Sequence, residues 1–222
     1  MNLLRYREIL NDLAQYPAAR LVAVSKTKPA ADIQTLYGEG QRLFGENKVQ
    51  EMATKYEVLP QDIEWHMIGH VQSNKVKYMA PLVSMIHAVD SLSLLQEINE
   101  QAQKHSRTIS CLLQIYIAEE ETKFGLSPDE ARELLDSPEL YWLDNIRICG
   151  LMGMATNTAD TSQIDNEFAT LRALFDSFKV QHFPNGTDFK ELSMGMSSDY
   201  RIALRHGATL IRIGSDIFGG RV

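Results

Sequence analysis

The sequence lacks the features of secreted, membrane-spanning and nucleic-acid-binding proteins. Its only two cysteines, Cys111 and Cys149, lie in apolar stretches, which indicates reduced, buried thiols. No apolar run approaches the roughly 20 residues that cross a bilayer, and residues 1–7 carry charges instead of the apolar core of a signal peptide. The net charge of -7 is the opposite of the basic excess that nucleic acid binding requires. These absences predict a cytoplasmic protein that contacts neither a membrane nor nucleic acid.

Also missing is the glycine-rich turn that follows the first strand of a doubly wound, dinucleotide-binding sheet. The first apolar, β-branched segment, Leu21–Ser25, instead runs into Lys26-Thr27-Lys28-Pro29. What the chain does contain is a regular alternation of short apolar segments with amphipathic ones. The apolar segments predict eight strands, over residues 21–25, 42–44, 64–68, 83–89, 110–117, 146–151, 191–193 and 209–213.

A further amphipathic helix is expected before the first strand, because Leu3, Tyr6, Leu10 and Leu13 recur at helical spacing. Later in the chain, Ser127-Pro128-Asp129-Glu130 is a capping box with proline in the first turn, which marks a helix start. Eight strands that alternate with helices are the pattern of a (β/α)8 barrel. Because no repeat or linker divides the chain, the sequence predicts one α/β domain over residues 1–222, a TIM barrel with an extra N-terminal helix.

Lys26 stands where the first strand ends, and the functional sites of such barrels lie at the C-terminal ends of the strands. Strand alternation places Val22, Val24 and Lys26 on one face, so the amine extends an apolar row toward the barrel mouth. Desolvation lowers the pKa of such an amine and favours Schiff-base formation. Taken alone, however, this position is more typical of a lysine that pairs with a carboxylate or reaches solvent.

The ends of the last two strands add the features of an anion site. Ser193-Met194-Gly195-Met196-Ser197-Ser198 runs from the seventh strand into a helix, and Gly214-Ser215 follows the eighth. The loops after these two strands frequently bind phosphate in barrels, although an N-cap serine and a glycine turn are common in their own right. Arg212 lies between Ile211 and Ile213, where a buried cation needs a partner such as a carboxylate or a pyridine nitrogen. Amine, phosphate loops and cation together describe a pyridoxal phosphate (PLP) site.

Long stretches of the chain resemble the pyridoxal phosphate homeostasis proteins, whose barrel is related to the N-terminal barrel of alanine racemase. The matching stretches are Leu21–Pro29, Phe44–Asn47, Trp65–Lys75, Gly150–Met152, Leu192–Ser197 and Arg212–Ser215. The resemblance implies a Schiff base of PLP on Lys26 and Arg212 at the pyridine nitrogen. It also implies that Asn47 lies near the cofactor and that the phosphate is held by Ser197, Gly214 and Ser215. The complete set expected to contact PLP is Lys26, Asn47, His66, Ser193, Met194, Met196, Ser197, Arg212, Gly214 and Ser215.

Two positions depart from the pattern of that family. Lys48 stands where a tyrosine is expected, at the rim of the pocket, and Val71 replaces a leucine, which is a conservative change in packing. His66 lies in the third strand and either lines the pocket or bonds to backbone. We expect no metal, because the residues between His66 and His70 form a strand and a turn, whereas a four-residue metal pair requires a helix. Lys123 either reaches the pocket as a second amine or belongs to a solvated run of charges.

The sequence favours a PLP carrier or regulator without catalytic residues over an enzyme. Racemisation needs two positioned acid or base groups, and in alanine racemases the second comes from a C-terminal domain, whereas this chain stops shortly after the eighth strand. An arginine at the pyridine nitrogen would also weaken the ring as an electron sink. The alternatives are a PLP-dependent racemase-like enzyme and an aldolase that forms a Schiff base with a sugar phosphate. The expected partners are PLP-dependent apoenzymes that receive the cofactor, and the chain is expected to be a monomer or weak homodimer.

Overall fold

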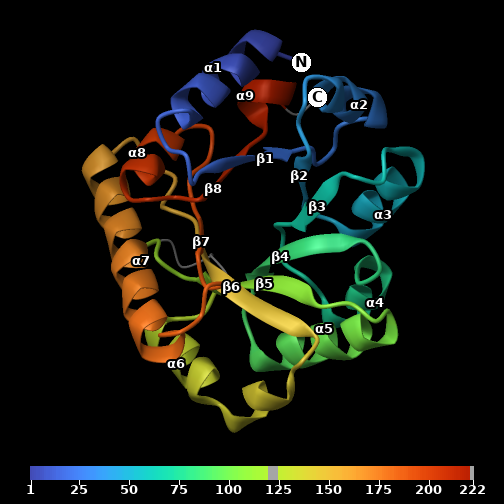
Figure 1. The fold of residues 1–222 in the computed structure, drawn as a ribbon. Helices are drawn as coiled ribbons and strands as arrows, with labels where there is room; N and C mark the ends of the chain where they lie inside the picture. Colours follow the sequence, from blue (N-terminus) through green and yellow to red (C-terminus); the bar gives the residue numbers. More distant parts are fainter. Residues whose placement is uncertain (120–124, 221–222) are drawn as a thin grey trace.

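The computed structural model describes residues 1–119 and 125–220, which form a closed barrel of parallel strands surrounded by helices (Figure 1). The strands follow chain order around the ring, and β1 pairs with β8 to close it. Their bounds are β1 (Arg20–Val24), β2 (Leu43–Glu46), β3 (Glu64–Met67), β4 (Val83–Val89), β5 (Ile109–Ile115), β6 (Ile146–Gly153), β7 (Glu191–Ser193) and β8 (Leu210–Ile213). The prediction of an eight-stranded α/β barrel is confirmed.

Helices cover the outside of this ring (Figure 1). They are α1 (Leu3–Leu13), α2 (Ala30–Gly38), α3 (Val49–Val58), α4 (Val76–Met79), α5 (Leu92–Lys104), α6 (Pro128–Asp136), α7 (Thr161–His182), α8 (Tyr200–Arg205) and α9 (Ser215–Phe218), with 3-10 turns η1 (Ser73–Lys75) and η2 (Pro138–Trp142). The extra N-terminal helix α1 lies against α9, where Asn2 N donates to Ile217 O at 2.6 Å. Helix α6 begins with the predicted capping box, because Ser127 and Glu130 bond reciprocally.

The core has two parts, one on each side of the strands. The larger part lies between the strands and the helices and contains the outward residues of β1, Leu21 and Ala23. The smaller part fills the barrel and contains Val22, Met85, Ala88, Leu112, Cys149, Met152 and Leu210. Strand alternation accounts for this division, because neighbouring residues of a strand face opposite sides of the sheet. Val22 therefore faces the barrel interior, as the sequence predicts. By the same alternation, the side chain of Lys26 is directed to the barrel mouth.

Both cysteines are buried free thiols, in agreement with the sequence analysis. Burial raises the pKa of Cys111 and of Cys149, so both stay protonated at neutral pH. Among the described residues, no helix has the length and hydropathy that a membrane span needs. The segment after Gln72 forms the 3-10 turn η1 before α4, and helix α8 begins at Tyr200, two residues after Ser198. Helix α9 and the turn η2 were not predicted.

Candidate functional site

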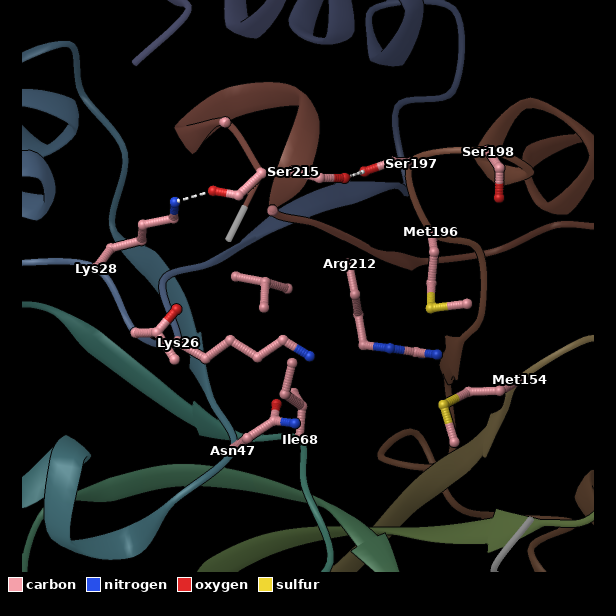
Figure 2. A pocket seen from close by; sticks show the side chains of 15 residues that line it. Lys26, Lys28, Asn47, Ile68, Met154, Met196, Ser197, Ser198, Arg212 and Ser215 are labelled. Carbon is pink, nitrogen blue, oxygen red and sulfur yellow. Dashed lines mark hydrogen bonds between the residues drawn. The ribbon is translucent and has the colours of Figure 1, made fainter. Parts of the chain in front are cut away.

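A cavity of about 440 Å³ opens at the C-terminal ends of the strands. Two segments far apart in sequence form its opposite walls, one around the end of β1 and the other around the loops after β7 and β8 (Figure 2). Most of the side chains that the sequence assigned to a cofactor meet here. They are Lys26, Asn47, Met196, Ser197, Arg212, Gly214 and Ser215.

Three of the residues assigned to the cofactor lie behind the cavity wall instead of lining it. Met194 is fully buried in the outer core, against the helices. Ser193 and His66 face the barrel interior and are almost completely buried there. Met194 follows Ser193 in the chain, so alternation turns the two side chains to opposite sides of the sheet. Lys123 lies outside the described residues.

Lys26 enters the cavity from the end of β1 and extends across it toward Arg212 (Figure 2). The chain turns sharply after this lysine, because Thr27 has a left-handed backbone conformation with φ of 62°. The Thr27 N–H donates to Glu51 Oε1 at 2.6 Å, which fixes the turn to helix α3. Lys28 then points to the rim, where its Nζ donates to the carbonyl of Gly220 at 2.9 Å. The turn therefore gives the two lysines different surroundings.

A buried ion cluster supports this turn from behind. Lys55 Nζ on α3 donates to Glu46 Oε1 and to Glu51 Oε1, both at 2.7 Å, and to the carbonyl of Ser25 at 2.8 Å. Ser25 Oγ donates to the same Glu46 oxygen at 2.6 Å. Burial raises the pKa of Glu46, although the bonds from Lys55 and Ser25 oppose that rise. Sequence reasoning missed this cluster, and the only local signal for it is the spacing of Glu51 and Lys55, four residues apart on one helix.

The loops after β7 and β8 meet on the opposite wall. Gly195 has φ of 93°, a conformation that glycine adopts readily, and it turns the first loop back over the barrel. Ser215 Oγ donates to Ser197 Oγ at 3.0 Å, which joins the two loops at the cavity rim (Figure 2). Two hydroxyls and the backbone at Gly214 thus form one polar patch. Such a patch can donate hydrogen bonds to an anion.

Gly214 is expected to tolerate no side chain, because a Cβ atom there would lie 2.8 Å from the backbone oxygen of Val24. Gly214→Ala should therefore separate β8 from β1 at the cavity wall and lower the free energy of unfolding by about 1–3 kcal/mol. Gly38→Ala is the matched control, because its Cβ would meet no atom within 4 Å at the end of a helix. That change should be neutral or stabilising by up to about 1 kcal/mol. Equal urea unfolding curves for both variants would contradict the close approach at Gly214.

Arg212 is buried beside the cavity and holds a positive charge there. Its NH1 donates to Ser193 Oγ at 2.6 Å and its NH2 donates to the carbonyl of Gly153 at 3.0 Å. Desolvation lowers the pKa of Arg212 to about 10, so the guanidinium remains protonated at neutral pH. The cavity lining also includes Lys26 and Lys28, and the described lining residues include no carboxylate. The site therefore favours an anionic ligand.

Two histidines continue the polar contacts of Arg212 into the barrel. His87 Nδ1 lies 2.9 Å from Ser193 Oγ, and His87 Nε2 lies 2.9 Å from His66 Nδ1. Burial lowers the pKa of His66 to about 3, and Arg20 lowers it further. Burial lowers the pKa of His87 well below its ordinary value, and His66, Arg212 and Arg20 lower it further. Both rings are therefore neutral at physiological pH. Nothing in the local sequence around His87 indicates this role, because its partners are brought together only by closure of the barrel.

The depressed histidine pKa values predict an acid-sensitive fold. An unfolded histidine takes up a proton below about pH 6.5, whereas His66 in the folded protein does so only near pH 3. The unfolded state therefore binds more protons between these values, and stability falls as the pH falls. Because His66 and His87 both contribute, the slope should approach about 2.7 kcal/mol per pH unit. Urea unfolding at several pH values from 7 to 5 measures it. His66→Gln should roughly halve the slope, and a wild-type stability independent of pH would contradict the burial of neutral rings.

A family model described as "Alanine racemase, N-terminal domain" matches residues 3–222. The chain is 39% identical over 219 residues to a pyridoxal phosphate homeostasis protein of Synechocystis sp., covering 98% of this chain and 97% of that protein. It is 37% identical over 206 residues to the protein of that name from Aquifex aeolicus, covering 91% and 87%. The chain belongs to the pyridoxal phosphate homeostasis protein family.

A similar protein has been solved both with and without PLP. The structure of PipY from Synechococcus elongatus with PLP bound has a TM-score of 0.84 and 37% identity, covering 96% of this chain and 99% of that one. The same protein without PLP has a TM-score of 0.86. Alanine racemase from Bartonella henselae is 19% identical with a TM-score of 0.72, and this chain covers 62% of it, so that likeness shows the fold alone. The two positions expected to depart from the family pattern lie off the cavity lining, since Lys48 is exposed and Val71 is buried in the core.

Proposed function

We propose that this protein binds pyridoxal 5'-phosphate as an internal aldimine on Lys26 and serves intracellular PLP homeostasis without catalysing a reaction. The observation that carries the proposal is the composition of the cavity. It combines a lysine amine, a buried arginine and a hydroxyl-lined loop pair, and its described lining has three cations and no carboxylate. PLP supplies the complementary groups, which are an aldehyde, a pyridine nitrogen and a phosphate.

Each part of PLP has a matching part of the site. The Lys26 amine would condense with the aldehyde to a Schiff base and release water, and Asn47 lies beside that lysine on the same wall (Figure 2). The phosphate is held by Ser197, Ser215 and the backbone at Gly214, where the two loops meet. Arg212, which can only donate hydrogen bonds, would donate to the pyridine nitrogen and favour its unprotonated form. Support also comes from relatives named for PLP homeostasis and from PipY, which has been solved with PLP bound.

The lining supports holding the cofactor rather than transforming a substrate. Racemisation needs a second acid or base on the face of the substrate opposite the first. The described lining residues with titratable side chains are Lys26, Lys28 and Arg212. Lys26 would supply one such group once a substrate amine displaced it, but a second is missing from the described lining, because Lys28 donates to Gly220 O at the rim and an arginine is too basic to exchange protons at neutral pH. We infer that the protein delivers PLP to apoenzymes in the cytoplasm and acts as a monomer or weak homodimer.

Reduction with borohydride and peptide mapping test the covalent bond. Protein incubated with PLP should carry one pyridoxyl group, and that group should map to the peptide containing Lys26. A pyridoxyl group on another lysine, or none, would contradict the proposal.

The proposed lack of catalysis needs its own experiment. Loaded protein is incubated with single enantiomers of amino acids in D₂O, and exchange of the α-proton is followed by NMR. Exchange should not exceed that caused by free PLP at the same concentration. Exchange at turnover rates of about 1 per second or faster, which is the range of typical enzymes, would instead establish a racemase-like enzyme.

A further inference from the structure

We propose that His66, His87 and Ser193 form a neutral positioning array that holds Arg212 at the cavity wall and leaves its charge for the ligand. The array lies behind the wall, and no member of it touches the cavity. Its geometry is a property of the protein alone, whereas its effect on ligand affinity rests on the proposed binding of PLP. His66 and Ser193 are therefore assigned here to positioning Arg212 rather than to direct contact.

Together with Arg212, the array forms a single row of short contacts across the barrel. It runs from Arg212 on β8 to Ser193 on β7, then to His87 on β4 and to His66 on β3. The three contacts measure 2.6, 2.9 and 2.9 Å, and all four side chains are at most 5% exposed. Buried polar groups that are hydrogen-bonded to one another in this way hold one another in a unique arrangement.

Arg212 fixes the position of the hydroxyl hydrogen of Ser193 and of the ring hydrogens of His87 and His66. A guanidinium has no acceptor, so Ser193 Oγ must accept from Arg212 NH1. Among the described residues, the only remaining partner for the Ser193 hydroxyl is His87 Nδ1, so the hydroxyl donates to it. His87 then carries its hydrogen on Nε2 and donates to His66 Nδ1. His66 in turn carries its own hydrogen on Nε2. Both neutral tautomers thus follow from one arginine.

The neutrality of the row matters for the charge of Arg212. Both of its hydrogen-bond acceptors, a hydroxyl and a carbonyl, are uncharged. Asp199 is the acid whose charge acts on Arg212, and its carboxylate accepts from the Met196 N–H rather than from the guanidinium. A carboxylate in the place of Ser193 would hold the arginine equally well but would neutralise most of its field. The array therefore positions the cation and leaves its positive potential directed at the cavity.

The other charged groups around the row also keep the histidines neutral. Arg20 on β1 acts on both rings and lowers the pKa of each, and its own partner is Glu191 on β7 at 2.7 Å. Arg212 acts on His87 from the other side. A proton on either ring would thus be a further cation between two arginines. The row therefore cannot act as a pH switch in the physiological range.

The histidine tautomers of the ligand-free protein test the array directly. Two-dimensional ¹⁵N NMR of histidine-labelled protein should show His66 and His87 unprotonated at Nδ1 and protonated at Nε2. Neither ring should titrate between pH 6 and 8, and the spectra of His66→Gln and His87→Gln assign the signals. A hydrogen on His87 Nδ1, or titration of either ring in that range, would overturn the proposal whether or not the protein binds PLP.

Variants of Ser193 connect the array to ligand binding. Ser193→Ala removes one of the two acceptors of Arg212 and the donor to His87, and we expect about tenfold weaker binding of PLP, or about 1.4 kcal/mol. Ser193→Thr keeps the hydroxyl and should stay within about threefold of the wild type. Absorption titration measures affinity, and thermal melting confirms that both variants fold. Equal affinities of the wild type and the alanine variant would overturn the role of the array. A wild-type protein with the expected tautomers that binds no PLP would instead refute the proposed function alone.

Discussion

Replacement of Lys26 by alanine is expected to abolish the covalent attachment of PLP. The absorption band at about 420 nm that an internal aldimine gives should be absent from the variant at any PLP concentration. The hydroxyls and Arg212 remain, so weak non-covalent binding should persist. We expect affinity to fall at least about 100-fold, which corresponds to about 2.7 kcal/mol. Titration of the purified apoprotein with PLP, followed by absorption and by borohydride reduction, measures both effects.

Lys48→Ala is the matched control for this experiment. Lys48 is exposed, lies outside the cavity lining and makes no capping bond at the start of α3. The Lys48 variant should therefore keep the absorption band and the affinity of the wild type. If Lys48→Ala keeps the absorption band, the loss of the band in Lys26→Ala results from the position of the amine rather than from the loss of one positive charge. An absorption band retained by Lys26→Ala would refute the covalent site.

The barrel and the approach of Lys26 to the cavity follow from local sequence patterns. Short apolar segments at regular spacing define the strands, and alternation along β1 places Val22 inside the barrel and Leu21 outside it. The same rule separates Ser193 from Met194 and, applied to β7, would have removed Met194 from the expected site. Elements of four or five residues, such as α9 and η2, carry too few positions for a periodic pattern and were missed for that reason.

The polar groups behind the cavity could not be predicted, because their partners are distant in sequence. His87 and Ser193 are 106 residues apart and meet only when β4 and β7 have taken their places in the closed ring. Lys55 reaches Ser25 across 30 residues in the same way. Local periodicity contains no information on such pairs. The sequence therefore predicts which residues reach the cavity better than it predicts what holds them there.

Lys55→Met is expected to produce the largest loss of stability of the changes considered. Lys55 is 6% exposed and Glu46 is fully buried, so the substitution leaves a buried carboxylate without its cation. Breaking one partner of a buried pair in this way costs about 3–5 kcal/mol. Urea unfolding measures the loss. Lys104→Met is the control, because Lys104 pairs with Glu100 on the surface, where both side chains are more than half exposed. That change should cost less than about 0.5 kcal/mol.

The dependence of this loss on pH and on Glu46 identifies its cause. Without Lys55, burial raises the pKa of Glu46 further above its unfolded value, so the folded variant binds a proton more readily than the unfolded chain does. The stability deficit of Lys55→Met should therefore shrink as the pH falls from 8 to 5.5. Glu46→Gln should recover most of the deficit in the double variant, because it removes the unpaired charge. If the stability deficit of Lys55→Met depends neither on pH nor on Glu46→Gln, Lys55 stabilises the fold through packing instead.

Loss of the buried ion cluster should also weaken PLP binding at the cavity. Lys55 binds the Ser25 carbonyl and Glu51, and Glu51 in turn accepts from the Thr27 N–H, so the cluster holds the residues on both sides of Lys26. In the double variant, which restores charge balance but not these bonds, the turn is less constrained. We therefore expect it to bind PLP more weakly than the wild type although its stability recovers. Recovery of both properties together would show that the cluster stabilises the barrel without orienting Lys26.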